Sequence, residues 1–160
     1  LNYYLSLLDA TREAARYYSN FVPFNDDGTD NMTFYTGVTE ETYANLDPTV
    51  RPGNSAYQGR RIILDPLEDD ILVTVFAWSE TDGLVRYPTS GTVRLFGNTT
   101  TKFTDAMITD EIASGSPNAG LLLVEVHYHY NPILTRLLLQ EPLLMRAHTI
   151  MPLSAAEPVE

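Results

Sequence analysis

The sequence predicts an α+β fold, in which one N-terminal helix precedes a mostly antiparallel sheet with a small inserted helix. Apolar side chains recur at alternating steps of four and three over residues 1–20, which is typical of a helix. Residues 71–79 and 120–130 are instead long strand-like runs with a period of two. The connections between such runs are compatible with hairpins, which favours antiparallel pairing.

Length and composition indicate one domain over residues 1–160. The chain has no Cys, which excludes disulfides, zinc–thiolate sites and thiol catalysis. Its formal net charge is −11, and only ten Lys and Arg are spread along it. A phosphate-binding surface needs clustered basic side chains, so we expect no nucleic-acid partner and no binding to an anionic bilayer surface.

The first element expected is a helix over residues 1–20, which ends at Asn20 ahead of Pro23. Its charged side chains Arg12, Glu13 and Arg16 lie mostly off the stripe that should face the sheet. That stripe is widened by Leu5 and consists of Tyr4, Leu8, Thr11, Ala15 and Tyr18. No N-cap precedes the helix, so we expect it to begin further upstream, as part of a longer helix.

Four strand-like runs occupy the middle of the chain, after a polar turn at 25–31 and a loop at 45–57. The run at 71–79 is apolar on both faces, so it is expected to be central and covered on both sides. Asp82-Gly83 forms a good hairpin turn after it. The acidic connection at 65–70 is expected to keep its charges in water. The four runs are 60–64, 71–79, 84–87 and 92–96.

The last part of the chain is predicted to hold a short helix at 104–114 and two strands, at 120–130 and 143–151. Residues 21–151 therefore make up the sheet part of the domain, and 152–160 form a tail. On the strand at 120–130, one face should carry Val124, Val126, Tyr128 and Tyr130. The other face, solvated or partly covered, should carry Glu125, His127 and His129.

Motifs for catalysis are absent from the sequence. It contains no GxSxG, no GxxxxGK[ST] and no HExxH pattern, and no Ser/His/Asp set can be argued from spacing. Carboxylates are numerous, but nothing marks a pair held across a cleft. We therefore expect no enzymatic activity, no small-molecule substrate and no cofactor.

Two segments offer ligands for a metal ion, although a structural role is the favoured interpretation of both. His127 and His129 share one face, and His148 joins them only if the last two strands pair in the right register. The turn at 25–31 misses the D-x-[DN]-x-[DN]-G spacing of a calcium loop. Its candidate ligands for weak Ca²⁺ binding are Asp26, Asp27 and Asp30. We expect folding to need no metal.

Two short segments resemble a known family. Residues 11–17, TREAARY, resemble the A-R-E-G-A-R-Y signature that follows the transmembrane helix of TadE/TadG-like pilus-assembly proteins, with Ala14 in place of Gly. Residues 124–132, VEVHYHYNP, look like the late V-x-V-x-Y-x-Y-x-P strand of that family. The closing strand is also similar, because Arg146 matches, although His148 stands where the family has an acidic residue. Residues 21–120 carry no matching motif.

This resemblance implies a pilin-like domain of a minor pilin or pseudopilin, in a tight-adherence (Flp-type) pilus or a related secretion assembly. It implies a cell-envelope location, with this domain exported and anchored to the membrane by a helix upstream of residue 1. The implied partners are other pilin or pilus-assembly subunits, and no catalytic residues are implied. Arg12, Glu13 and Arg16 then become candidate subunit contacts, with a merely solvated helix face as the alternative.

Two other functions stay open for the same sequence. One is a free secreted β-rich binding module, for example for carbohydrate, that uses surface Tyr side chains and Trp78. The other is a pilin-like receptor or adhesin tip. A span of about 20 apolar residues directly upstream favours the pilin interpretation, whereas a cleavable signal peptide favours the secreted module.

Overall fold

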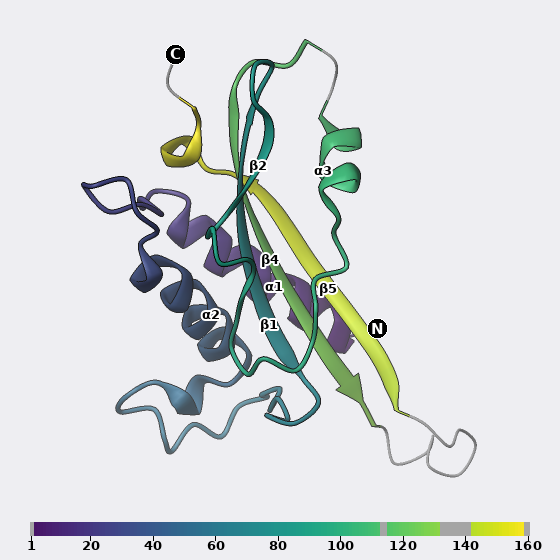
Figure 1. Ribbon diagram of the computed structural model, residues 1–160. Helices are drawn as coiled ribbons and strands as arrows, with labels where there is room; N and C mark the ends of the chain where they lie inside the picture. The colour runs from purple at the N-terminus through teal and green to yellow at the C-terminus, as the bar shows by residue number, and fades with distance from the viewer. Residues whose placement is uncertain (1, 113–114, 132–141, 159–160) are drawn as a thin grey trace.

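The computed structural model describes residues 2–112, 115–131 and 142–158 (Figure 1). Its elements, in chain order, are α1 (Asn2–Tyr18), α2 (Met32–Leu46), η1 (Pro48–Val50), β1 (Asp70–Ser79), β2 (Gly83–Tyr87), β3 (Val93–Arg94), α3 (Asp105–Glu111), β4 (Ala119–Tyr130), β5 (Leu143–Pro152) and η2 (Ser154–Ala156). The strands form one sheet in the order β2-β1-β4-β5, and β3 also pairs with β1. Every pairing is antiparallel, which confirms the predicted α+β plan.

The sheet is covered on both faces, and β1 lies at its centre. Helices α1 and α2 cover one face (Figure 1), where Tyr35 and Ala15 pack with Val75 and Val124. The other face carries a smaller apolar cluster of Phe76, Leu123 and, from α3, Ile108. The prediction of a central strand that is covered on both sides is therefore confirmed.

Helix α1 runs along β4 and β5, but its buried stripe differs from the predicted one. Thr11 and Ala15 are buried as expected, and the Thr11 hydroxyl shares a 2.7 Å hydrogen bond with the Thr149 hydroxyl of β5. Tyr4 and Leu5 are instead 38% and 48% exposed. The side chains that replace them in the core are Leu7, Ala10 and Ala14. The stripe turns because α1 packs against α2 as well as against the sheet.

Helix α2 was not predicted, because Thr, Tyr, Phe and Val favour strands. The Asn31 side chain accepts a hydrogen bond from the Phe34 amide and so caps the first turn. Inside the helix, the Thr39 and Thr42 hydroxyls donate to carbonyls three and four residues earlier, which satisfies their buried oxygens. Tertiary packing of the buried face of α2 therefore outweighs the strand propensity of its residues.

Three smaller predictions are changed or left open. Residues 60–64 form no strand, although Ile62 and Leu64 are buried, because both sides of β1 are already paired with β2, β3 and β4. The strand expected at 92–96 shortens to β3. Helix α3 confirms the helix predicted from residue 104, with the Thr104 hydroxyl as its N-cap. Ser114 and the Leu-rich connection at 132–141 lie outside the described residues.

Candidate interaction surface on helix α1

The charged side chains of α1 lie on its exposed face, opposite the buried stripe. Arg12, Glu13 and Arg16 are all exposed, as the sequence predicts. Arg16 Nη2 lies 2.7 Å from Glu13 Oε2, and both side chains are more than half exposed. An ion pair in such a position contributes at most about 1 kcal/mol to stability. These residues are therefore available for contacts outside the fold.

The same face continues into a groove of about 450 Å³ between α1 and α2. One wall is aromatic, because the rings of Tyr17 and Phe21 lie 5.3 Å apart and are 56% and 45% exposed. The other wall is ionic, because Arg51 Nη2 lies 2.6 Å from Glu41 Oε1 and 2.9 Å from Asn45 Oδ1. The groove thus combines exposed aromatic surface with both signs of charge.

Tyr18 directs its neighbour Tyr17 outwards. The Tyr18 ring packs edge-on against Phe34 at 5.6 Å and lies over Gly37 of α2, where an added Cβ would come within 2.3 Å of the Tyr18 hydroxyl. Burial raises the pKa of Tyr18, and the charge of Glu41 adds to this rise. Because consecutive helix residues point about 100° apart, Tyr17 is left facing the groove. Sequence reasoning missed Tyr17 and Phe21, since the groove exists only with α2 beside them.

Of the two alternatives predicted for the outer sheet face, solvated or partly covered, the structure shows a covered face at Glu125 and His127. Glu125 and His127 are each only 1% exposed, because the segment that precedes α3 crosses this face. The Thr101 hydroxyl and the Lys102 amide of that segment both donate to the Glu125 carboxylate. His127 Nε2 lies 3.5 Å from Glu125 Oε1. These contacts hold the covering segment on the sheet.

The acidic connection at 65–70 is solvated only in part: Asp65 and Glu68 are exposed as expected, whereas Asp69 and Asp70 are buried. Asp70 accepts hydrogen bonds from the backbone amides of Phe96, Asn98 and Thr99 at 2.8–3.1 Å. Asp69 Oδ1 accepts a 2.7 Å hydrogen bond from the His129 amide. Both carboxylates therefore satisfy backbone groups that lie far away in the sequence.

The three histidines that could have formed a metal site have separate partners. His127 lies beside Glu125, whereas His129 Nδ1 lies 3.1 Å from Asp69. His148 packs on the Phe103 ring at 4.7 Å, and its burial, together with the charge of Lys102, lowers its pKa. Over residues 2–112, 115–131 and 142–158, no three His, Asp or Glu side chains are grouped as a metal site requires.

The turn at 25–31 is confirmed, and its carboxylates also have separate partners. Asp27 Oδ1 accepts hydrogen bonds from the amide and hydroxyl of Thr29, which lower its pKa. Asp30 Oδ2 accepts two hydrogen bonds from Thr89, at 2.8 and 2.7 Å. Asp30 therefore ties the turn to the loop after β2.

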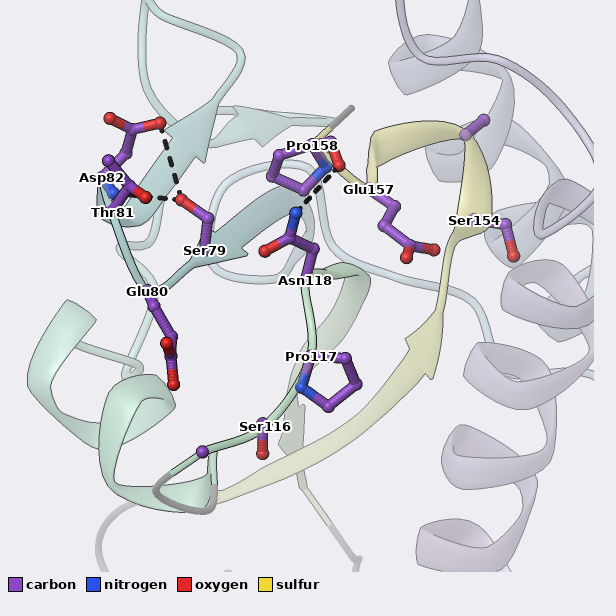
Figure 2. Close-up of a pocket in the computed structure, with 12 residues that line it drawn as sticks. Ser79, Glu80, Thr81, Asp82, Ser116, Pro117, Asn118, Ser154, Glu157 and Pro158 are labelled. Carbon is purple, nitrogen blue, oxygen red and sulfur yellow. Dashed lines mark hydrogen bonds between the residues drawn. The ribbon is translucent and has the colours of Figure 1, made fainter. Parts of the chain in front are cut away.

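A larger polar cleft, of about 970 Å³, lies at the end of the β1–β2 hairpin (Figure 2). Its three carboxylates, of Glu80, Asp82 and Glu157, come from different positions around the opening (Figure 2). Asp82 turns towards Ser79, whose hydroxyl accepts a 3.0 Å hydrogen bond from the Asp82 amide. The described lining holds no His, Lys or Arg, so it offers acceptors but no cation or imidazole base.

No protein-family model, curated protein or solved structure matches this chain. Among the residues described, no helix has both the length and the apolar character needed to cross a membrane. The groove and the charged face of α1, together Arg12, Glu13, Arg16, Tyr17 and Phe21, are named here the α1 surface.

Proposed function

We propose that this chain is a non-enzymatic subunit of a cell-envelope assembly, of the minor pilin or pseudopilin kind, in a tight-adherence pilus or a related secretion machine. It binds neighbouring subunits through the α1 surface. The observation that carries this proposal is the difference between the two faces of α1. One face packs on the sheet and on α2, whereas the other leaves charged and aromatic side chains exposed.

The two segments that resemble TadE/TadG-like proteins support the proposal, because they contact each other. Ala15 of the first segment packs in one cluster with Val124 of the second. Ala14 and Ala15 are fully buried, whereas Arg12, Glu13 and Arg16 in the same seven residues are exposed. The small residues of this segment thus serve packing, and its charged residues are left for partners.

The resemblance also supports a location in the cell envelope. We propose that the domain is exported and is held at the membrane on the N-terminal side of α1. In this arrangement the α1 surface lies near the membrane, where other pilin or pilus-assembly subunits meet it. Their contacts with an aromatic and charged groove fit the composition of protein–protein interfaces, in which Tyr, Phe and Arg are enriched.

Charge reversal on α1 tests this proposal. The double variant Arg12→Glu/Arg16→Glu should leave the melting temperature nearly unchanged, since exposed charges contribute little to stability. It should sharply reduce assembly in cells that lack the wild-type gene, measured by electron microscopy and by the yield of sheared filaments. Arg94→Glu, an exposed charge on β3, is the matched control and should assemble normally. Normal assembly by the double variant would reject the α1 surface.

One observation favours a second candidate, a carbohydrate-binding module. The exposed Tyr17 ring lines the same groove as the exposed Asn20 side chain, and an aromatic ring with an amide in the same groove is suited to a sugar. Trp78 does not serve this role as expected, because it is largely buried and its indole N–H is enclosed. Glycan-array binding that is lost in Tyr17→Ala and kept in Tyr57→Ala would favour this candidate over the assembly subunit.

A further inference from the structure

Strand β5 forms a long edge of the sheet. It pairs with β4 through ten consecutive residue pairs without a bulge, from Leu121↔Pro152 to Tyr130↔Leu143. Within residues 2–112, 115–131 and 142–158, no strand pairs with its other side. About half of the amide and carbonyl groups of β5 therefore point away from the sheet, available to another strand.

Edge strands usually carry features that prevent such pairing, and β5 has few of them. Lysine, inward charges, bulges and proline are the common devices. The only proline of β5 is its last residue, Pro152, and its only fixed charge is Arg146. The opposite edge strand, β2, is half as long, with five residues. The outer edge of β5 is thus the better template for a further strand.

Two exposed apolar side chains of β5, Leu144 and Ile150, are placed symmetrically along it. The register puts Leu144 opposite His129 and Ile150 opposite Leu123, on the sheet face away from α1. Leu144 and Ile150 are 37% and 36% exposed. Each lies three residues from Ala147, one before it and one after it. An antiparallel copy of the same strand, centred on Ala147, therefore places each of these apolar side chains opposite the other.

We propose that β5 pairs antiparallel with β5 of a second copy of this chain, about a two-fold axis at Ala147, so that two sheets join into one. Leu144 then lies opposite Ile150 of the second copy, and the same pair occurs twice because of the symmetry. Apolar pairs directly opposite each other are a main source of sheet stability. This inference is independent of the proposed function.

Only this axis position pairs Leu144 with Ile150. With the axis at His148, Leu144 meets Pro152 and Ile150 meets Arg146. With the axis at Arg146, Leu144 meets His148. The side chains on the sheet face away from α1 therefore select one register among those that the backbone permits.

The charges of the chain favour β5 as the contact between two copies. Each copy has a net charge of −11, so two copies repel each other wherever carboxylates face. Strand β5 has no Asp or Glu. In the proposed register Arg146 faces His148 of the second copy, and burial beside Lys102 lowers the pKa of that imidazole, which keeps it neutral at pH 7. The contact thus sets no like charges opposite each other.

A designed disulfide tests the register, in a chain without native Cys. Residues directly opposite in an antiparallel pair have Cα atoms about 4.5–5.5 Å apart, which a disulfide bridges. Leu144→Cys/Ile150→Cys should therefore form a covalent dimer on mild oxidation. Each single variant is the control, because the two copies of position 144, like the two copies of position 150, lie about 20 Å apart in this register. Cross-linking of the double variant no faster than that of the single variants would overturn the proposal.

Charged substitutions at the same two positions test whether two copies of the chain associate through β5. Leu144→Lys/Ile150→Lys sets Lys opposite Lys in both symmetric pairs, and it should raise the dissociation constant at least about tenfold in sedimentation equilibrium. Leu144→Lys/Ile150→Glu sets Lys opposite Glu, and it should keep the dimer. Circular dichroism checks that both variants fold. A wild-type chain that stays monomeric at millimolar concentration, or equal association of the two variants, would overturn the proposal.

Discussion

The two faces of the sheet are covered in different ways. Under α1 and α2 the contacts are apolar, as where Tyr35 and Val38 pack on Val75 and Val124. The opposite face is partly covered by an irregular segment, which is held by the buried carboxylates of Asp70 and Glu125. One face is therefore stabilised mainly by burial, and the other mainly by hydrogen bonds to charged groups.

This difference arises because one covering element satisfies its own backbone hydrogen bonds and the other does not. A helix satisfies its amides internally, so it can lie on an apolar surface. The segment from Phe96 to Thr104 has no such internal pairing, and amides that it buries need acceptors from elsewhere. Asp70 and Glu125 supply them. The burial of Asp70 and Glu125 is thus explained by the segment that covers them.

The largest expected effect comes from removing the main acceptor on the outer face. Asp70→Ala leaves the amides of Phe96, Asn98 and Thr99 without their partner. We expect the free energy of unfolding to fall by about 3–5 kcal/mol, since each unsatisfied buried donor costs about 1–3 kcal/mol and the segment relaxes in part. Urea unfolding measures this. Glu68→Ala, an exposed acid of the same connection, should change stability by less than about 0.5 kcal/mol. If Asp70→Ala lowered the free energy of unfolding as little as Glu68→Ala does, the hydrogen bonds of Asp70 would not be what holds residues 96–104 on the sheet.

The next largest effect tests which side chains of α1 are buried against the sheet. Leu7 is fully buried between α1 and the sheet, whereas Leu5 is half exposed. Leu7→Ala should cost about 2–5 kcal/mol, the range for deleting a buried leucine side chain. Leu5→Ala is the matched control and should cost far less. Equal losses in urea unfolding would favour the stripe that the sequence predicts over the observed one.

A smaller effect should appear in the pH dependence of stability. Burial, with Lys102 nearby, lowers the pKa of His148 in the folded state below its unfolded value of 6.5. The unfolded chain therefore binds more protons near and below that pH, and stability should fall as the pH drops from about 7 towards 5. His148→Gln should flatten this slope in urea unfolding at several pH values. An unchanged slope would show that His148 does not contribute to it.

The smallest effect concerns the buried hydroxyl of Tyr35, on the sheet face that α1 and α2 cover. Burial raises the pKa of Tyr35, and its hydroxyl has no hydrogen bond among the described residues. Tyr35→Phe removes this enclosed polar atom and keeps the ring. We expect stability to stay within about 0.5 kcal/mol or to rise, because nothing is left unpaired. Val38→Ala, at the same face of α2, should be clearly destabilising by the same measurement. A large loss in Tyr35→Phe would indicate a hidden partner for the hydroxyl.

The sequence predicted the elements whose pattern is local. The apolar run from Ile71 to Ser79 and the alternation from Val124 to Tyr130 indicate the strands correctly, because burial on known faces sets their period. Helix α2 was missed because its residues favour strands, and only packing against α1 and the sheet makes it helical. The 60–64 run shows the converse, since it has strand-like residues but lies at the end of α2, where the Ile62 amide donates to the Leu46 carbonyl, and not beside a free strand edge.

The α1 surface was also predicted only in part, because local spacing in the sequence reveals only local features. The exposure of Arg12, Glu13 and Arg16 follows from helical spacing within one element. The groove at Tyr17 depends on α2, which lies beyond the reach of local spacing. The burial of Asp70 depends on a segment about 26 residues later in the chain. Features that join distant segments are those that single-sequence reasoning does not reach.

The hydrogen bond between Thr11 and Thr149 has a consequence for the order of synthesis. It joins residues 138 positions apart, and much of the packing surface of α1 belongs to β5. Helix α1 leaves the ribosome early, but its binding surface is complete only when residues 143–152 have emerged. Its apolar stripe therefore stays accessible to chaperones during most of translation, until the last strand of the sheet arrives.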